Sequence, residues 1–173
     1  LVAAGSVMGE ERAALIARMN TEVPNAYDQL AERHSAVELR YEPDWRSRGL
    51  AHALAEARND DIRRGVSTVG PHRDDIEISI NGLTARFHAS QGEQRSVVLA
   101  LRLAVHRMVA ESVGSVPILV LDDVLSELDP DRANALIANL PKGQVIITSA
   151  SGVPEETKPD AIVRIAAGEV VES

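Results

Sequence analysis

Ala89-Ser90-Gln91-Gly92-Glu93-Gln94-Arg95 opens the stretch that decides the fold of this chain. Two further segments complete it: Ile118-Leu119-Val120-Leu121-Asp122-Asp123 and Ser126-Glu127-Leu128-Asp129. The first two segments are separated by an amphipathic sequence with the length and period of a helix. Its apolar residues recur at steps of three and four, so we expect them to share one face: Val97, Val98, Leu101, Val105, Met108 and Val109. The stretch therefore predicts a helix followed by a strand.

The first turn of this predicted helix has the spacing of a capping box. Ser90 and Glu93 are three residues apart, so each side chain can satisfy a free backbone N–H of the turn. Gly92 keeps side-chain atoms out of the turn, which would let a ligand approach the backbone closely. A helix N-terminus carries partial positive charge and suits a phosphate oxygen. An ordinary capped helix without a ligand is the alternative.

An apolar run, residues 117–121, ends abruptly in Asp122 and Asp123. Its branched residues are typical of a strand that is buried on both faces. Parallel sheets bind ligands at the carboxyl ends of their strands, and Mg²⁺ is held there by one or two carboxylates together with substrate phosphates. The alternative is that both aspartates cap the next turn.

The order of these segments resembles the second half of an ABC-type ATPase head, where a signature motif, a Walker B strand and a D-loop follow one another. In detail the chain is similar to the RecF family of bacterial recombination and repair proteins, which are relatives of SMC-type ATPases. Gly70-Pro71-His72-Arg73-Asp74-Asp75, a hallmark of that family, lies upstream. The resemblance is close from Arg58 to Ala150 and looser outside these residues.

The resemblance implies a role for each matching position. Asp122 matches the Walker B aspartate that holds Mg²⁺, and Asp123 lies where ABC proteins carry the glutamate that polarises the attacking water. These are the candidate catalytic residues, and Asp122 is also the candidate metal residue. The candidate cofactor-binding residues match the signature and the D-loop: Ser90, Gln91, Gly92, Glu93, Ser126 and Asp129. The Ser90 hydroxyl and the Gly92 N–H would contact the γ-phosphate of ATP held by an opposite subunit.

A phosphate-binding Walker A loop is absent from the sequence. No G-x-x-x-x-G-K-[ST] occurs, and the two lysines, Lys142 and Lys158, lie in no such loop. We therefore expect an ABC-type ATPase only in a longer protein, with the missing half before Leu1, and no ATPase activity in this chain alone. The usual switch histidine is also absent, with Thr148 or Ser149 in its place, which suggests slow hydrolysis.

The predicted fold is α/β: a partial ABC-type, P-loop NTPase-like head lobe with a small helical arm subdomain. We assign residues 1–65 to the arm and residues 66–173 to the second half of the head. Helical patterns cover residues 9–39, with a break or kink at Pro24, and residues 46–63. Short strands are expected at residues 37–41, at 76–80 paired with 83–87 around Asn81-Gly82, at 145–148, and in a terminal hairpin around Gly168.

Composition limits the possible classes of protein. The 173 residues carry a net charge of −8, which argues against a globally basic nucleic-acid binder. Arginines gather between Arg40 and Arg73, but acids interrupt them, which favours a solvated face over a DNA patch. The chain contains no cysteine, no apolar run near the length of a membrane span, and no export pattern. We expect a cytoplasmic, nucleoid-associated protein without a membrane partner.

The resemblance also implies ligands and partners. It implies ATP and Mg²⁺ as cofactors, a second copy of the protein in an ATP-dependent dimer, DNA at gaps or single/double-strand junctions, and recombination mediator proteins. Two alternatives stay open. One is the nucleotide-binding subunit of an ABC transporter, and the other is a non-enzymatic interaction module with the same fold.

Overall fold

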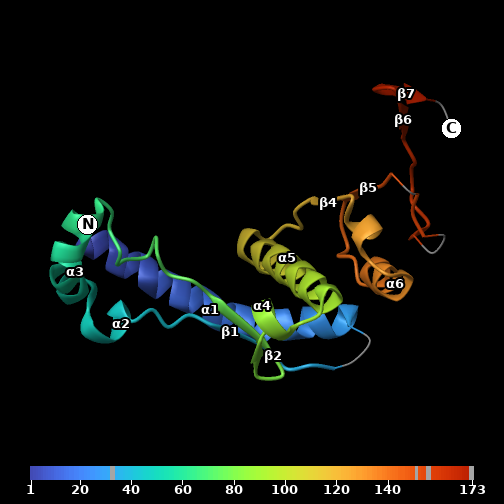
Figure 1. Ribbon diagram of the computed structural model, residues 1–173. Helices are drawn as coiled ribbons and strands as arrows, with labels where there is room; N and C mark the ends of the chain where they lie inside the picture. Colours follow the sequence, from blue (N-terminus) through green and yellow to red (C-terminus); the bar gives the residue numbers. More distant parts are fainter. Residues whose placement is uncertain (32–33, 151, 155–156, 172–173) are drawn as a thin grey trace.

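The computed structural model describes residues 1–31, 34–150, 152–154 and 157–171. Helices and small sheets alternate along the chain, as an α/β fold requires (Figure 1). The elements are α1 (Val2–Leu30), β1 (Val37–Arg40), α2 (Trp45–Arg48), α3 (Leu50–Arg64), β2 (Glu77–Ile80), β3 (Leu83–Thr84), α4 (Ala85–His88), α5 (Gln91–Val113), β4 (Leu119–Asp122), the 3-10 helix η1 (Val124–Glu127), α6 (Pro130–Ala138), β5 (Val145–Thr148), β6 (Arg164–Ala166) and β7 (Glu169–Val171).

The long helix α1 connects the two ends of the molecule, with α3 at its start and α6 near its end (Figure 1). It runs without a break through Pro24 and ends at Leu30, so the predicted break at Pro24 and the helical extension to residue 39 are wrong. A proline removes one backbone hydrogen bond from a helix. Burial of Val23, Ala26 and Tyr27 around this turn offsets that loss, since each is at most 2% exposed.

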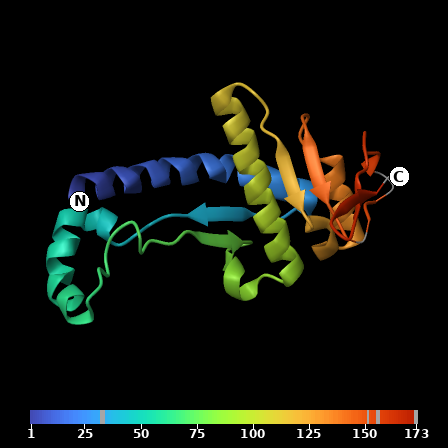
Figure 2. The same ribbon diagram turned by 90° about the horizontal axis from the view of Figure 1, so that it is seen from above.

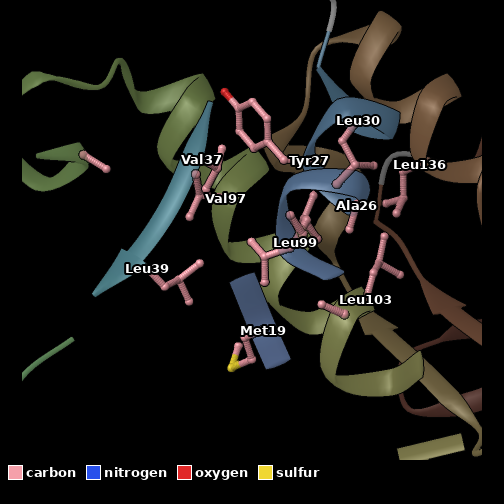
Figure 3. Packing of buried hydrophobic residues seen from close by; sticks show 14 of the residues in the cluster. Met19, Ala26, Tyr27, Leu30, Val37, Leu39, Val97, Leu99, Leu103 and Leu136 are labelled. Atoms are coloured by element: carbon pink, nitrogen blue, oxygen red, sulfur yellow. The ribbon is translucent and has the colours of Figure 1, made fainter. Parts of the chain in front are cut away.

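The main core forms where α5 packs across α1 (Figure 3). Tyr27 and Leu30 of α1, Leu103 of α5 and Leu136 of α6 are each at most 2% exposed. Fully burying such a side chain stabilises the fold by about 1.5–3 kcal/mol. The core therefore fixes α5 and α6, which precede and follow the two aspartates, against one common helix.

The apolar residues of α5 occupy two faces rather than the single face expected from the sequence. Val97 and Met108 are buried with Leu103, but Val98 is 55% exposed, Val105 43% and Val109 40%. The period of three and four residues identifies apolar stripes, and a helix can carry two of them. The inner stripe packs on α1, while the outer stripe lies at the surface.

An antiparallel sheet joins residues that are far apart in the sequence. β1 pairs with β2 in the register Val37↔Ile80, and β2 pairs with β3 around the Asn81-Gly82 turn. Both turn residues have positive φ, 52° and 79°, which confirms the hairpin predicted from Asn-Gly. The returning strand is shorter than expected, because α4 begins at Ala85.

The sheet links the two parts into which the sequence was divided. β1 lies in the expected arm, residues 1–65, and pairs with β2 in the expected head, residues 66–173. The two parts also meet where α1 of the arm packs against α5 of the head. The predicted helix at 46–63 is divided at Gly49, which has a φ of 86°, into α2 and α3. The boundary between arm and head stays a prediction.

The second sheet carries the aspartates. β4 and β5 are parallel, with Leu119 opposite Val145 and Asp122 opposite Thr148 (Figure 2). Leu119 and Leu121 are buried, but Val120 is 59% exposed, so the strand is buried on one face and the prediction of burial on both faces is wrong. The physical reason is that only one face of this pair packs against the core.

The end of the chain forms a small hairpin. β6 pairs with β7 around Gly168, whose φ is 84°, which confirms the predicted terminal hairpin in shorter form. Within the described residues, none of the helices combines the length and the apolar character that a membrane span needs.

Candidate functional site

The start of α5 is a complete capping box. The Glu93 N–H donates to the Ser90 hydroxyl oxygen at 3.3 Å, while the Ser90 N–H and hydroxyl donate to Glu93 Oε2 at 2.7 and 2.8 Å. These bonds from Ser90 hold the pKa of the Glu93 carboxyl below its ordinary value. Ser90 and Gln91 are exposed, while Gly92 and Glu93 are partly buried. The predicted cap is confirmed.

The first turn of α5 is connected to the segment that matches the D-loop. The guanidinium of Arg95 donates to the backbone oxygen of Glu127 at 2.5 Å, and its Nε lies 3.8 Å from the Glu127 carboxylate. Between the two segments lies a groove of about 540 Å³, bordered by Gln91 and Val98 on α5 and by Leu128 beyond η1. Two of the sequence-predicted segments therefore come together in one surface.

Asp122 and Asp123 lie at the carboxyl end of β4, where both are exposed. Thr148, at the end of the neighbouring strand, donates its hydroxyl to Asp122 Oδ1 at 2.5 Å. The Asp123 N–H donates to that hydroxyl oxygen at 3.0 Å and to the Thr148 carbonyl at 3.2 Å. One threonine thus holds both residues of the acidic pair in place.

Asp123 has an unusual backbone conformation for a residue other than glycine. Its φ is 50°, in the left-handed region, where Asp is tolerated better than most residues but still at a cost. The Ser126 hydroxyl donates to the Asp123 carbonyl at 2.8 Å and stabilises the turn into η1. Ser126 is therefore joined directly to the acidic pair.

Asp129 has a structural role within its own chain. It caps α6 by accepting the Arg132 N–H at 2.9 Å, and its carboxylate also pairs with the Arg132 guanidinium. These bonds lower the pKa of Asp129 below its ordinary value. The N-cap of α6 is thus the same aspartate that was matched to the D-loop.

The oxygen atoms at the end of β4 suit a hard cation that also binds the phosphates of a substrate. Asp122 offers a carboxylate and Thr148 a hydroxyl, and both are oxygen donors. Among the described residues, no cluster of three or more His, Cys, Asp or Glu side chains could hold a metal without other ligands. Mg²⁺ is commonly held by one or two carboxylates together with water and substrate phosphates.

The Gly70–Asp75 loop forms a joint between elements. Asp74 accepts the Tyr41 hydroxyl at 2.6 Å and Trp45 Nε1 at 2.8 Å, and Arg12 of α1 donates to the Pro71 carbonyl. Burial and the Asp74 carboxylate raise the pKa of Tyr41 above its ordinary value. The sequence analysis missed this joint, although the single Trp of the chain was a usable signal.

The arginines between residues 40 and 73 are partly neutralised by acids. Arg48 pairs with Glu56 at 2.9 Å and Arg63 with Asp60 at 2.8 Å, both on or beside α3. These exposed pairs agree with the expected solvated face.

Comparison with solved structures identifies the class of protein. Two structures of the recombination mediator protein RecF in the RecFOR pathway, described as RecF-ATP and RecF-ATPrS, each match with a TM-score of 0.78 and 25% identity. Each match covers 96% of this chain and 46% of the solved chain. The chain therefore has the fold of part of an ABC-type ATPase head.

Curated proteins with similar sequences carry the name RecF. "DNA replication and repair protein RecF" of Heliobacterium modesticaldum is 39% identical over 171 residues, covering 91% of this chain and 46% of the relative. RecF of Symbiobacterium thermophilum is 36% identical over 187 residues, covering 99% of this chain and 50% of the relative. No family model matches the chain. The resemblance to RecF is confirmed, and the chain spans about half the length of the curated relatives it matches.

Proposed function

We propose that this chain is the part of a RecF-type DNA repair ATPase that supplies the signature helix, the Mg²⁺-binding aspartate and the D-loop. The observation that carries the proposal is the acidic pair at the end of β4, which Thr148 holds next to a strand-to-helix turn. This turn continues into Glu127, which bonds Arg95 in the exposed first turns of α5. Such an arrangement has a place for a phosphate at one end and a cation at the other.

The proposed site is shared between two copies of the protein. Ser90 and the N–H groups of the first turn of α5 bind the γ-phosphate of ATP that lies on the opposite copy. Asp122 would hold Mg²⁺, which would supply positive charge to the phosphates. Asp123 orients the attacking water, but its side chain is one methylene shorter than the usual glutamate, so we propose slow hydrolysis. ATP binding and dimerisation are then coupled.

DNA and recombination mediator proteins are the proposed partners. Support comes from the relatives, which are called DNA replication and repair proteins, and from the solved RecF, which is called a recombination mediator of the RecFOR pathway. Since the net charge is −8 and arginines pair with acids on α3, DNA contacts would come from a local surface. We propose residues 1–65 as the arm and residues 66–173 as the head half in this assembly.

The proposal is tested by ATP-dependent dimerisation of the complete RecF-type protein, measured by sedimentation. Ser90→Asp keeps an N-cap side chain of the preferred kind, so the fold should stay intact, but it places negative charge against the γ-phosphate. We expect ATP-dependent dimers to disappear in this variant. Ser90→Thr, which keeps both cap and hydroxyl, is the matched control and should still dimerise. If the Asp variant forms dimers at the ATP concentrations that dimerise the wild-type protein, the proposal is contradicted.

The chain alone is expected to have no ATP affinity, because it carries no Walker A sequence. Isothermal titration of residues 1–173 with Mg²⁺ and ATP measures this directly. Micromolar binding would contradict the assignment of the nucleotide to a site completed by other residues.

A further inference from the structure

Arg132 of α6 lies directly over the first turn of α5. A Cβ atom added to Gly92 would be 2.8 Å from Nη1 and 3.1 Å from Cζ of the Arg132 guanidinium. Contacts below 3.0 Å essentially do not occur, so a side chain at residue 92 and the present position of Arg132 exclude each other. A side chain at residue 92 would have to displace the end of the Arg132 side chain, which costs little for a flexible side chain and more where its other contacts hold it.

Acidic groups hold the guanidinium in this place. Arg132 pairs with Asp129, and its charge contributes to the low pKa of Glu93 and opposes the raised pKa of the buried Tyr27. Its side chain is 22% exposed, and its Nε is buried without a hydrogen-bond partner among the described residues. A cation at a helix N-terminus is unfavourable by itself, so the acids are needed to keep it there.

We propose that Arg132 is a positioning residue, a brace that fixes the start of the signature helix against the D-loop. The Nη1 of its guanidinium pairs with Asp129 and lies in the space that a side chain at residue 92 would occupy. The brace acts with the Arg95–Glu127 contact, which joins the same two segments one turn further along α5. Its importance for ATP rests on the proposed function, while the contact itself does not.

The brace makes a specific prediction about Gly92. In an ordinary helix, Gly→Ala raises stability by about 0.5–1 kcal/mol, which corresponds to about 1–4 °C in Tm for a chain of this size. Here Gly92→Ala should instead lower the Tm of residues 1–173, because the new methyl group displaces the guanidinium. In the Arg132→Ala background the same Gly92→Ala change should raise the Tm. The sign of one substitution thus reports the presence of the brace.

A second measurement follows the charge of Arg132 by NMR titration of Glu93. Arg132→Ala should raise the pKa of Glu93, whereas Arg132→Lys, which keeps the charge, should leave it low. Arg102, which is exposed on α5, is the matched control. Arg102→Ala should change neither the sign of the Gly92→Ala effect on Tm nor the pKa of Glu93. A Gly92→Ala change with the same sign in both backgrounds, or a Glu93 pKa indifferent to Arg132, would overturn the brace.

These measurements need no nucleotide, so their outcome is separate from that of the proposed function. If the sign does not reverse, the brace is lost and ATP-dependent dimerisation can still stand. If the sign reverses and dimerisation fails, the brace stands as a structural contact and the proposed function is lost.

Discussion

At the scale of single residues, Thr148 connects the site, since its one hydroxyl bonds both members of the acidic pair, Asp122 and Asp123. We predict that Thr148→Val in the complete protein abolishes most Mg²⁺-dependent ATP turnover, because Asp122 loses its hydroxyl donor and the Asp123 N–H keeps only the backbone carbonyl of residue 148 as its acceptor. The cost in stability should be about 1 kcal/mol, the usual worth of a hydrogen bond. Turnover and urea unfolding, measured side by side, check this.

Thr148→Ser is the matched control because it keeps the hydroxyl and removes only a methyl group. It should retain turnover. A Val variant as active as wild type would show that the threonine merely caps the strand.

The capping box gives a second prediction at the same scale, concerning pH. The folded-state pKa of Glu93 is lowered by its bonds from Ser90, so the stability it contributes is present above its ordinary pKa of about 4.3 and is lost as pH falls through the lower folded pKa. Urea unfolding of residues 1–173 should lose this contribution on acidification. Glu93→Gln, whose amide oxygen can still accept from Ser90, should not lose it.

The comparison between Glu93 and its Gln variant isolates this group, because Asp61 and Asp129, whose pKa values are also lowered, titrate in both proteins. The free-energy difference between the two proteins should shrink as the pH falls. A difference that stays constant from pH 7 to pH 3 would contradict the assigned role of the carboxylate.

At the scale of elements, the Asp74 joint holds α2 and β1 together. Asp74→Ala removes the acceptor for Tyr41 and Trp45, so we predict a loss of about 2 kcal/mol in unfolding free energy. It should also move the pKa of Tyr41 down toward its ordinary value, while burial keeps it somewhat raised. Spectroscopic titration of tyrosine measures the second effect.

The neighbouring Asp75 is the matched control, since it is exposed and bonds only the backbone N–H of Ile76 among the described residues. Asp75→Ala should leave Tyr41 unchanged. If both variants behave alike, the loop does not act as a joint.

Elements were predictable where neighbouring residues alone decide the structure. The Ser90–Glu93 cap and the Asn81-Gly82 hairpin depend on local hydrogen bonds and backbone preferences, and both were confirmed. Pro24 was misjudged because the residues beside it, Val23, Ala26 and Tyr27, are buried against parts of the chain that are far away in the sequence, and this burial outweighs one missing bond. Val98 and Val105 were misplaced because periodicity does not say which of two apolar stripes the rest of the fold will cover.

The candidate site was predictable in part. The matching segments came from the resemblance to RecF, and the cap geometry from spacing. The contact of Arg132 with Gly92 could not be predicted, since it depends on how α6 packs beside α5 and not on any local pattern.

At the scale of the whole molecule, several apolar side chains remain at the surface on elements that carry the site. Val98 and Val105 lie on the outer stripe of α5, and Val120 and Ile146 on the outer face of β4 and β5, each at least 43% exposed. Exposed apolar side chains are typical of an interface where they form one contiguous patch.

The central claim is that Ser90 of one copy and Asp122 of another complete a single ATP site, and mixing two inactive variants of the complete protein tests it most directly. Ser90→Asp and Asp122→Asn should each be inactive alone. In a mixed dimer, one site carries both changes and the other carries neither.

Equal mixing should therefore restore turnover that neither variant shows alone, because each mixed dimer keeps one intact site that can still join the two copies. If all pairs formed equally well, the recovery would be about one quarter of wild type. This is the result that the account predicts. Two variants that stay as inactive together as they are apart would contradict a shared site.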